Sequence, residues 1–119
     1  MKLIAFFCLF LGTSYHLQAA EGCMTIHGRA RYYSGDGQLR IWHIGTHHEY
    51  EPVDPSWDTV ISWLEAGVKK SERANYYIPA SAVDLFADFE VCPTEPLRKG
   101  AVQHAQVKSA SHRHYVTKE

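Results

Sequence analysis

Three histidines that lie close together in the sequence have side chains able to bind a metal ion. His43, His47 and His48 flank a Gly-Thr pair, and a bend there would let at least two imidazoles face one point. Imidazole is the commonest metal ligand, and Asp88 or Glu90 could add an oxygen ligand, a mixed set that suits zinc or copper. However, adjacent residues on a strand point to opposite faces, so His47 and His48 need a bulge to bind one ion. Because the chain has no His-Glu-x-x-His spacing, metal binding is an alternative function here.

Arginines beside a tryptophan form a second candidate site, suited to binding a partner. Arg29 and Arg31 share one parity in an alternating segment, and Arg40, Trp42 and His43 follow in the next one. Arginine beside an aromatic ring recognises ligands by stacking and by paired hydrogen bonds. These five residues predict a face that binds an envelope protein, a peptide or a glycan. The alternative role of the arginines is cross-strand pairing with acidic residues, which are Glu49, Glu51 and Glu90.

Evidence for catalysis in the sequence is sparse. Asp84, Asp88 and Glu90 alternate along one segment and could supply a carboxylate pair for glycoside hydrolysis. Acids that alternate in this way more often form the solvated face of a strand. The chain has no Gly-x-Ser-x-Gly elbow, and its Gly-Asp-Gly stretch at 35–37 does not open a helix that would hold a phosphate. The residues therefore favour a binding or accessory module over an enzyme, with a small hydrolase as a further alternative.

The first twenty residues have the layout of a secretory signal peptide. Lys2 gives a charged start, residues 3–11 are apolar, and Ala19 and Ala20 offer a cleavage site near 19–22. The apolar run is shorter than the roughly 20 residues that span a bilayer. We therefore expect a periplasmic or secreted protein without a transmembrane segment, consisting of a signal peptide at 1–20 and one domain at 21–119.

The cysteines predict a disulfide bond. Cys8 would leave with the signal peptide, which leaves Cys23 and Cys92 as an even pair in an oxidising compartment. A lipid anchor at Cys23 is disfavoured, because Glu21 is unusual before a lipidated cysteine and the apolar run ends too early. A structural disulfide between Cys23 and Cys92 is the expectation.

Alternation and turn residues predict strands at 23–33, 39–44 and 47–53, with a hairpin turn at Asp36-Gly37. A helix should follow, with Asp54 as its N-cap, Pro55 as its first residue and an early end near Gly67. Later strands are expected at 76–78, 83–91 and 101–107, with a short one at 115–116 inside a tail, 108–119, that frays.

These elements predict a mainly β domain with one helix. The order of strands and helix suggests a small, partly open five-stranded β-barrel of OB-like type, and a two-layer α+β sandwich is the alternative. The 12 basic and 13 acidic residues nearly balance, which gives no reason to expect nucleic acid as a partner.

Two stretches resemble a family of small exported bacterial proteins whose function is not established. The first is Gly28-Arg29 followed by Leu-Arg-Ile-Trp-His-Ile-Gly-Thr-His-His-Glu-Tyr at 39–50, and the second is Phe-Ala-Asp-Phe-Glu-Val-Cys-Pro at 86–93. The resemblance implies an exported single domain and implies no catalytic residues. The chain departs from the pattern at 103–107, where the relatives tend to have a further cysteine.

Overall fold

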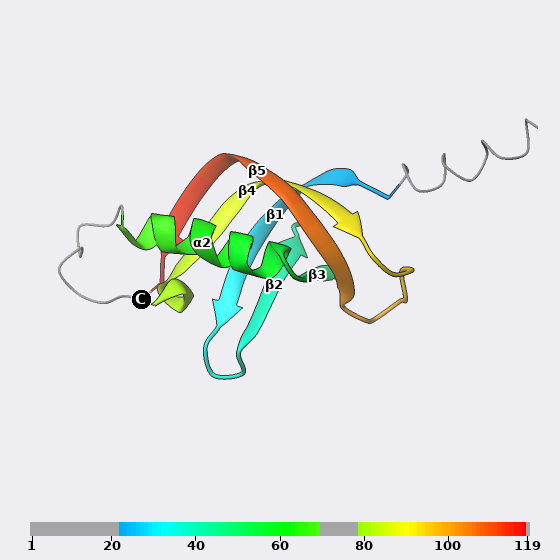
Figure 1. The fold of residues 1–119 in the computed structure, drawn as a ribbon, viewed down its shortest axis with the longest axis horizontal. Helices are drawn as coiled ribbons and strands as arrows, with labels where there is room; N and C mark the ends of the chain where they lie inside the picture. Colours follow the sequence, from blue (N-terminus) through cyan, green and yellow to red (C-terminus); the bar gives the residue numbers. More distant parts are fainter. Residues whose placement is uncertain (1–21, 70–78, 119) are drawn as a thin grey trace, which may run out of the picture.

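Five strands and one long helix form the part of the chain that the computed structural model describes, residues 22–69 and 79–118 (Figure 1). The elements are β1 (Met24–Tyr33), β2 (Gln38–His43), β3 (Glu49–Pro52), α2 (Ser56–Lys69), the 3-10 turn η2 (Ala80–Ala82), β4 (Val83–Pro93) and β5 (Gln103–Thr117). The expected signal peptide and the expected strand at 76–78 lie outside the described residues.

The strands close into a barrel in the order β1-β2-β3-β5-β4. β1 pairs antiparallel with both β2 and β4, and β4 pairs antiparallel with β5. Closure comes from a short parallel pairing between β3 and β5, in which Tyr50 lies opposite Gln103 and Pro52 opposite Ala105. This confirms the small OB-like barrel and corrects one detail, because the barrel is closed where the sequence suggested a partly open one. A two-layer sandwich is therefore not the architecture.

The inward faces of the strands follow the alternation expected for half-buried strands. The alternate residues of β4 predicted to face the core are all buried, and they are Val83, Leu85, Ala87, Phe89 and Val91. The largest fully buried side chains come from β2, β3, β4 and the helix, and they are Phe89, Leu39, Ile41, Leu64, Leu85, Val60, Val83, Val91 and Pro52. One core therefore fills the barrel and extends under α2.

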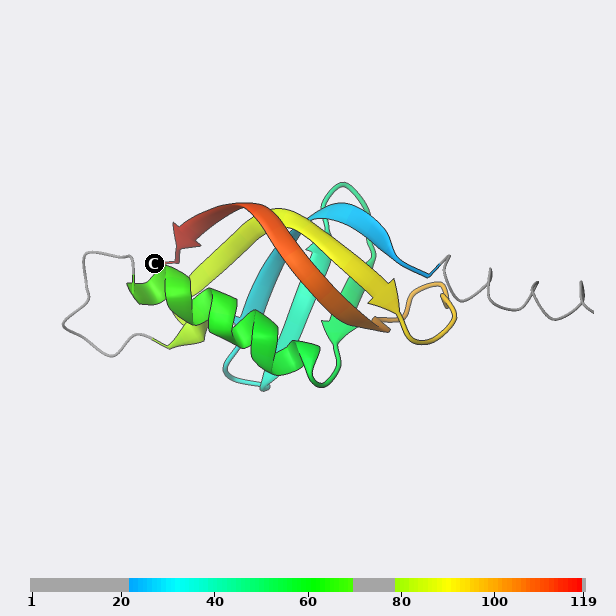
Figure 2. The same cartoon turned by 45° about the horizontal axis from the view of Figure 1, so that its top comes forward.

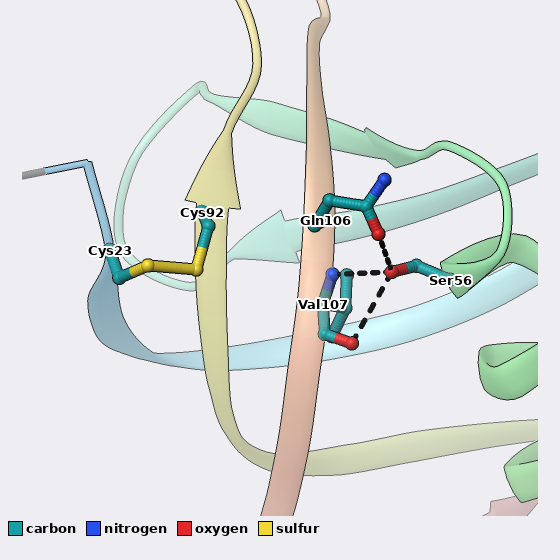
Figure 3. The surroundings of a disulfide bond; sticks show 5 residues. All are labelled: Cys23, Ser56, Cys92, Gln106 and Val107. Carbon is teal, nitrogen blue, oxygen red and sulfur yellow. Dashed lines mark hydrogen bonds between the residues drawn. A yellow bond between two sulfur atoms is a disulfide. The ribbon is translucent and has the colours of Figure 1, made fainter. Parts of the chain in front are cut away.

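The helix begins one residue later than predicted and docks onto β5 through its first side chain. The hydroxyl of Ser56 accepts a hydrogen bond from the Val107 N–H at 2.7 Å and donates to Gln106 Oε1 at 2.7 Å (Figure 3). The Gln106 amide in turn donates to the Asp54 carbonyl at 2.9 Å. Pro55 precedes the helix, and its carbonyl accepts from the Thr59 N–H at 3.4 Å. Ser56 is therefore buried and fixes the start of the helix against the barrel.

The other end of α2 continues through Gly67 to Lys69, although the sequence suggested that Gly67 ends it. Gly67 is buried because the ring of Tyr115 from β5 packs directly on it, where a Cβ atom would stand. The Tyr115 hydroxyl donates to the Trp63 carbonyl at 2.9 Å. Close approach of the helix to the strand, not helix termination, is the role of this glycine.

We expect Gly67→Ala to destabilise the protein although alanine is the better helix former by about 1 kcal/mol. The added methyl group would overlap the Tyr115 ring, and overpacking of this kind costs about 1–3 kcal/mol. Chemical denaturation should show a lower midpoint for Gly67→Ala. The double variant Gly67→Ala/Tyr115→Ala should recover the loss relative to Tyr115→Ala alone, and additive losses would contradict the proposed overlap.

The C-terminal residues are part of the barrel. β5 runs without interruption over 15 residues to Thr117, which pairs with Val83, and the Lys118 N–H donates to the Ala82 carbonyl at 2.7 Å. The expected frayed tail at 108–119 and separate strand at 115–116 are therefore wrong for residues 108–117. A register shift that includes His112, whose φ is 53°, lets the long strand bend around the barrel.

Candidate functional site

The predicted disulfide is present at one end of the barrel. The antiparallel register sets Met24 of β1 opposite Val91 of β4, so the preceding Cys23 meets the following Cys92 with 4.0 Å between their Cα atoms (Figure 3). This bond uses the Cys23 sulfur that a lipid anchor would require. The register of two strands thus joins residues 69 positions apart.

The predicted metal histidines do not come together. Among residues 22–69 and 79–118, three potential ligand atoms lie within 4.8 Å of one another only at Cys23, Glu90 and Cys92. The two sulfurs of that group are bonded to each other, so it is a disulfide beside a carboxylate. His43, His47 and His48 form no such group, although the His43 N–H donates to the His48 carbonyl at 3.1 Å across the β2–β3 turn. Metal binding stays a prediction of the sequence.

A pocket of about 900 Å³ opens at the same end of the barrel as the disulfide. Its walls are the start of β1, the β2–β3 loop with the start of β3, and the β4–β5 loop at 94–102. Figure 2 shows the start of β1 and the β4–β5 loop at this end, on the right. The volume lies in the range of natural ligand pockets. We refer to this feature as the barrel-end pocket.

The apolar wall of the barrel-end pocket carries side chains that water can reach. In the described part of the chain, three large hydrophobic side chains are exposed, namely Met24 at 45%, Leu97 at 66% and Val116 at 40%. Met24 and Leu97 both line the pocket, and Tyr50 from the barrel core adds an aromatic ring. Exposed apolar surface gathered in a concave site is characteristic of a place that a ligand covers.

Polar groups inside the pocket are held in a fixed arrangement. His48 Nε2 and Gln103 Oε1 lie 2.9 Å apart, and the Gln103 amide donates to the Glu95 carbonyl at 2.8 Å. The imidazole of His48 packs edge-on against the Tyr50 ring, with 4.6 Å between centroids. Burial raises the pKa of the Tyr50 phenol. The network ties the β2–β3 loop to the start of β5 and shapes the pocket wall.

The face predicted to bind a partner is largely occupied by its own contacts. We call Arg29, Arg31, Arg40, Trp42 and His43 the Arg–Trp face. The Arg29 guanidinium stacks over the Trp42 ring at 5.0 Å, and the Trp42 N–H donates to the Thr46 carbonyl at 2.7 Å. Arg29 Nε is buried without a hydrogen-bond partner among the described residues. Stacking therefore compensates only part of the lost hydration of this arginine.

The other two arginines of the Arg–Trp face form ion pairs. Arg31 binds Asp84 with two hydrogen bonds, of 2.8 and 2.5 Å, and these bonds raise the pKa of Arg31. Arg40 donates to Glu51 at 2.9 Å. The ion-pairing alternative of the sequence is thus found for Arg40 with Glu51 and, at 3.9 Å, with Glu49. The partner of Arg31 is Asp84, an acid that the sequence suggested to be solvated.

His43 departs from the predicted face. It shares parity with the inward-facing Leu39 and Ile41, so it does not lie on the side of β2 that carries Arg40 and Trp42. The predicted binding set is thus divided between two sides of the strand.

The three acidic candidates of β4 also have separate roles. Asp84 is only 4% exposed and is paired with Arg31, which corrects the expectation of a solvated position. The Asp88 carboxylate lies 3.1 Å from Nδ1 of His27 and 3.0 Å from Nδ1 of His112. These contacts, that of His27 first, lower the pKa of Asp88. Glu90 lies beside the disulfide. The geometry therefore places Asp84 in an ion pair with Arg31 and Asp88 within hydrogen-bond distance of two imidazoles.

Of the residues that line the barrel-end pocket, sequence reasoning named only His47 and His48; among those that it missed are Met24, Tyr50, Leu97 and Gln103. One signal was available, because Leu97 is an apolar residue next to Arg98-Lys99 in a loop with two prolines and a glycine. The other three belong to strands, and their shared location depends on how β1, β3 and β5 close the barrel.

The fold and this pocket define the chain as a small OB-like barrel with a ligand-sized cavity at one end. No protein-family model matches the chain, and no curated protein or solved structure matches it significantly. Within residues 22–69 and 79–118, none of the helices has the length and apolar character needed to cross a membrane.

Proposed function

We propose that the protein is an exported, non-enzymatic binding module that holds a ligand with an apolar part in the barrel-end pocket. The observation that carries this proposal is the position of Met24 and Leu97, two of the three exposed large hydrophobic side chains in the described residues. The signal-peptide layout at 1–20 and the disulfide between Cys23 and Cys92 support export.

The proposal is tested with a neutral apolar dye, N-phenylnaphthylamine, whose fluorescence rises when it leaves water. We expect saturable binding by the oxidised domain and an affinity about tenfold weaker for Leu97→Gln, because the apolar contact of one leucine is removed. Leu97 lies in an exposed loop, so this change should leave the fold intact.

Two control variants locate the site. Val116→Gln removes the third exposed hydrophobic side chain, which does not line the pocket, and should leave dye binding unchanged. Trp42→Ala tests the Arg–Trp face, where the stacked Arg29 makes a second candidate surface. Binding that survives Leu97→Gln but is lost in Trp42→Ala would move the site to that face, and absence of saturable binding would refute the proposal.

A further inference from the structure

We infer that the ligand of the barrel-end pocket is a single-chain amphiphile with a carboxylate head, an inference that rests on the proposed function. The pocket combines an apolar wall with a basic edge in one cavity of about 900 Å³. A ligand of matching chemistry has an alkyl chain that covers Met24 and Leu97 and an anionic group that meets the basic edge.

The charge of the pocket has one sign. Its lining contains Arg98, Lys99, His47 and His48, and none of the described lining residues is acidic. A site whose charged lining residues are all basic attracts anions and repels cationic amphiphiles. The lining therefore selects the sign of the ligand's head.

The one acid of the β4–β5 loop is engaged elsewhere. The Glu95 carboxylate accepts from the His104 N–H at 2.9 Å and lies 2.8 Å from the His104 imidazole. These contacts, the backbone one first, and the nearby charge of Arg98 lower the pKa of Glu95. Glu95 does not line the pocket. Arg98 and Lys99 therefore line a cavity whose described lining contains no acidic residue.

The loop that carries the two cations is anchored at both ends. The Thr94 N–H donates to the His104 carbonyl at 2.9 Å, and the Gln103 amide donates to the Glu95 carbonyl at 2.8 Å. Inside the loop, the Ala101 N–H donates to the Arg98 carbonyl at 3.1 Å next to Gly100, whose φ is 80°. Arg98 and Lys99 follow Leu97 directly in the sequence, and all three line the pocket. Charged and apolar contacts therefore come from one segment.

The guanidinium of Arg98 offers a geometric match to a carboxylate head. A guanidinium presents a planar fork that matches the two oxygens of a carboxylate, and one ammonium adds a further donor. A phosphate group has three strong acceptor oxygens and carries more than one charge. Arg98 can hold a carboxylate through its fork while Lys99 adds a donor, and the test below includes a phosphate head for comparison.

The inference is tested by displacement of N-phenylnaphthylamine with amphiphiles of one chain length, used below their micelle concentrations. Decanoate should displace the dye at a concentration about tenfold lower than decanol, because hydrogen bonds to a charged head add affinity. Decyltrimethylammonium should displace it least. In Arg98→Gln/Lys99→Gln the preference for decanoate over decanol should disappear.

The controls separate this inference from the proposed function. Lys108→Gln removes an exposed cation of β5 that does not line the pocket, and it should keep the preference for decanoate. If decanol or decyltrimethylammonium competes as well as decanoate, or if decyl phosphate binds more tightly, the carboxylate assignment is overturned while the pocket still binds. Failure of the dye itself to bind would instead refute the proposed function.

Discussion

Replacing Cys23 and Cys92 together by alanine is expected to lower the free energy of unfolding by about 4 kcal/mol, the chain-entropy value for a loop of this length. The disulfide joins residues 69 positions apart, at the start of β1 and near the end of β4. Without the disulfide, the unfolded chain gains conformational entropy. The residue pairs at this end of the β1–β4 ladder also lose the covalent bond that holds them together. Urea unfolding of the wild-type and double-alanine proteins, followed by tryptophan fluorescence, measures the difference.

A matched control comes from the wild-type protein in reducing buffer. Its midpoint should fall to that of the double variant, whereas the double variant should not respond to the reductant. Because Met24 follows Cys23 and lines the barrel-end pocket, the affinity for the dye should also be lower in the protein without the disulfide. Equal unfolding midpoints with and without the bond would contradict a structural role for this disulfide.

Arg31→Met is expected to lower the free energy of unfolding by about 3 kcal/mol, the lower end of the cost of breaking a buried ion pair. The Asp84 side chain is only 5% exposed and would lose both hydrogen bonds of the guanidinium, while the arginine itself is 27% exposed. Lys118 Nζ lies 3.8 Å from Asp84 and would offset part of the remaining charge. The same urea measurement reports the loss.

Two further variants show whether the uncompensated carboxylate causes the loss. Arg31→Met/Asp84→Leu removes both charges and should recover most of the stability, because an apolar pair can replace a buried ion pair. Arg40→Met is the matched control on the neighbouring strand, where Glu51 is 30% exposed and can be hydrated, so its cost should stay below about 1 kcal/mol. A loss for Arg40→Met as large as that for Arg31→Met would argue against burial of Asp84 as the cause.

Local patterns in the sequence predicted most of the barrel. Alternation in β4 identified which residues face the core, because a strand places successive side chains on opposite sides whatever its partners are. Errors arose where a tertiary contact overrides a local signal. Gly67 resembles a helix end, yet the ring of Tyr115 requires a residue without a side chain there. Asp84 resembles a solvated acid, yet Arg31 on a neighbouring strand allows its burial.

The candidate site was far less predictable. His47 and His48 were selected for metal binding, and the structure places them in the wall of a pocket whose other members were not foreseen. The Arg–Trp face was identified as a stacked cation and ring, but its other arginines are joined to acids. A residue's type indicates what it can bind, whereas only its neighbours determine whether that capacity is still available.

The sequence by itself determined the small β-rich barrel with one helix and the pairing of Cys23 with Cys92, because alternation is local and an even pair of cysteines leaves one partner each. Only the tertiary structure decided that the barrel closes and that a pocket forms at its end. Closure depends on the parallel pairing of β3 with β5, segments separated by the helix and β4. The same closure brings Met24, Tyr50 and Leu97 into one cavity, and no local pattern encodes a meeting of segments so distant in the chain.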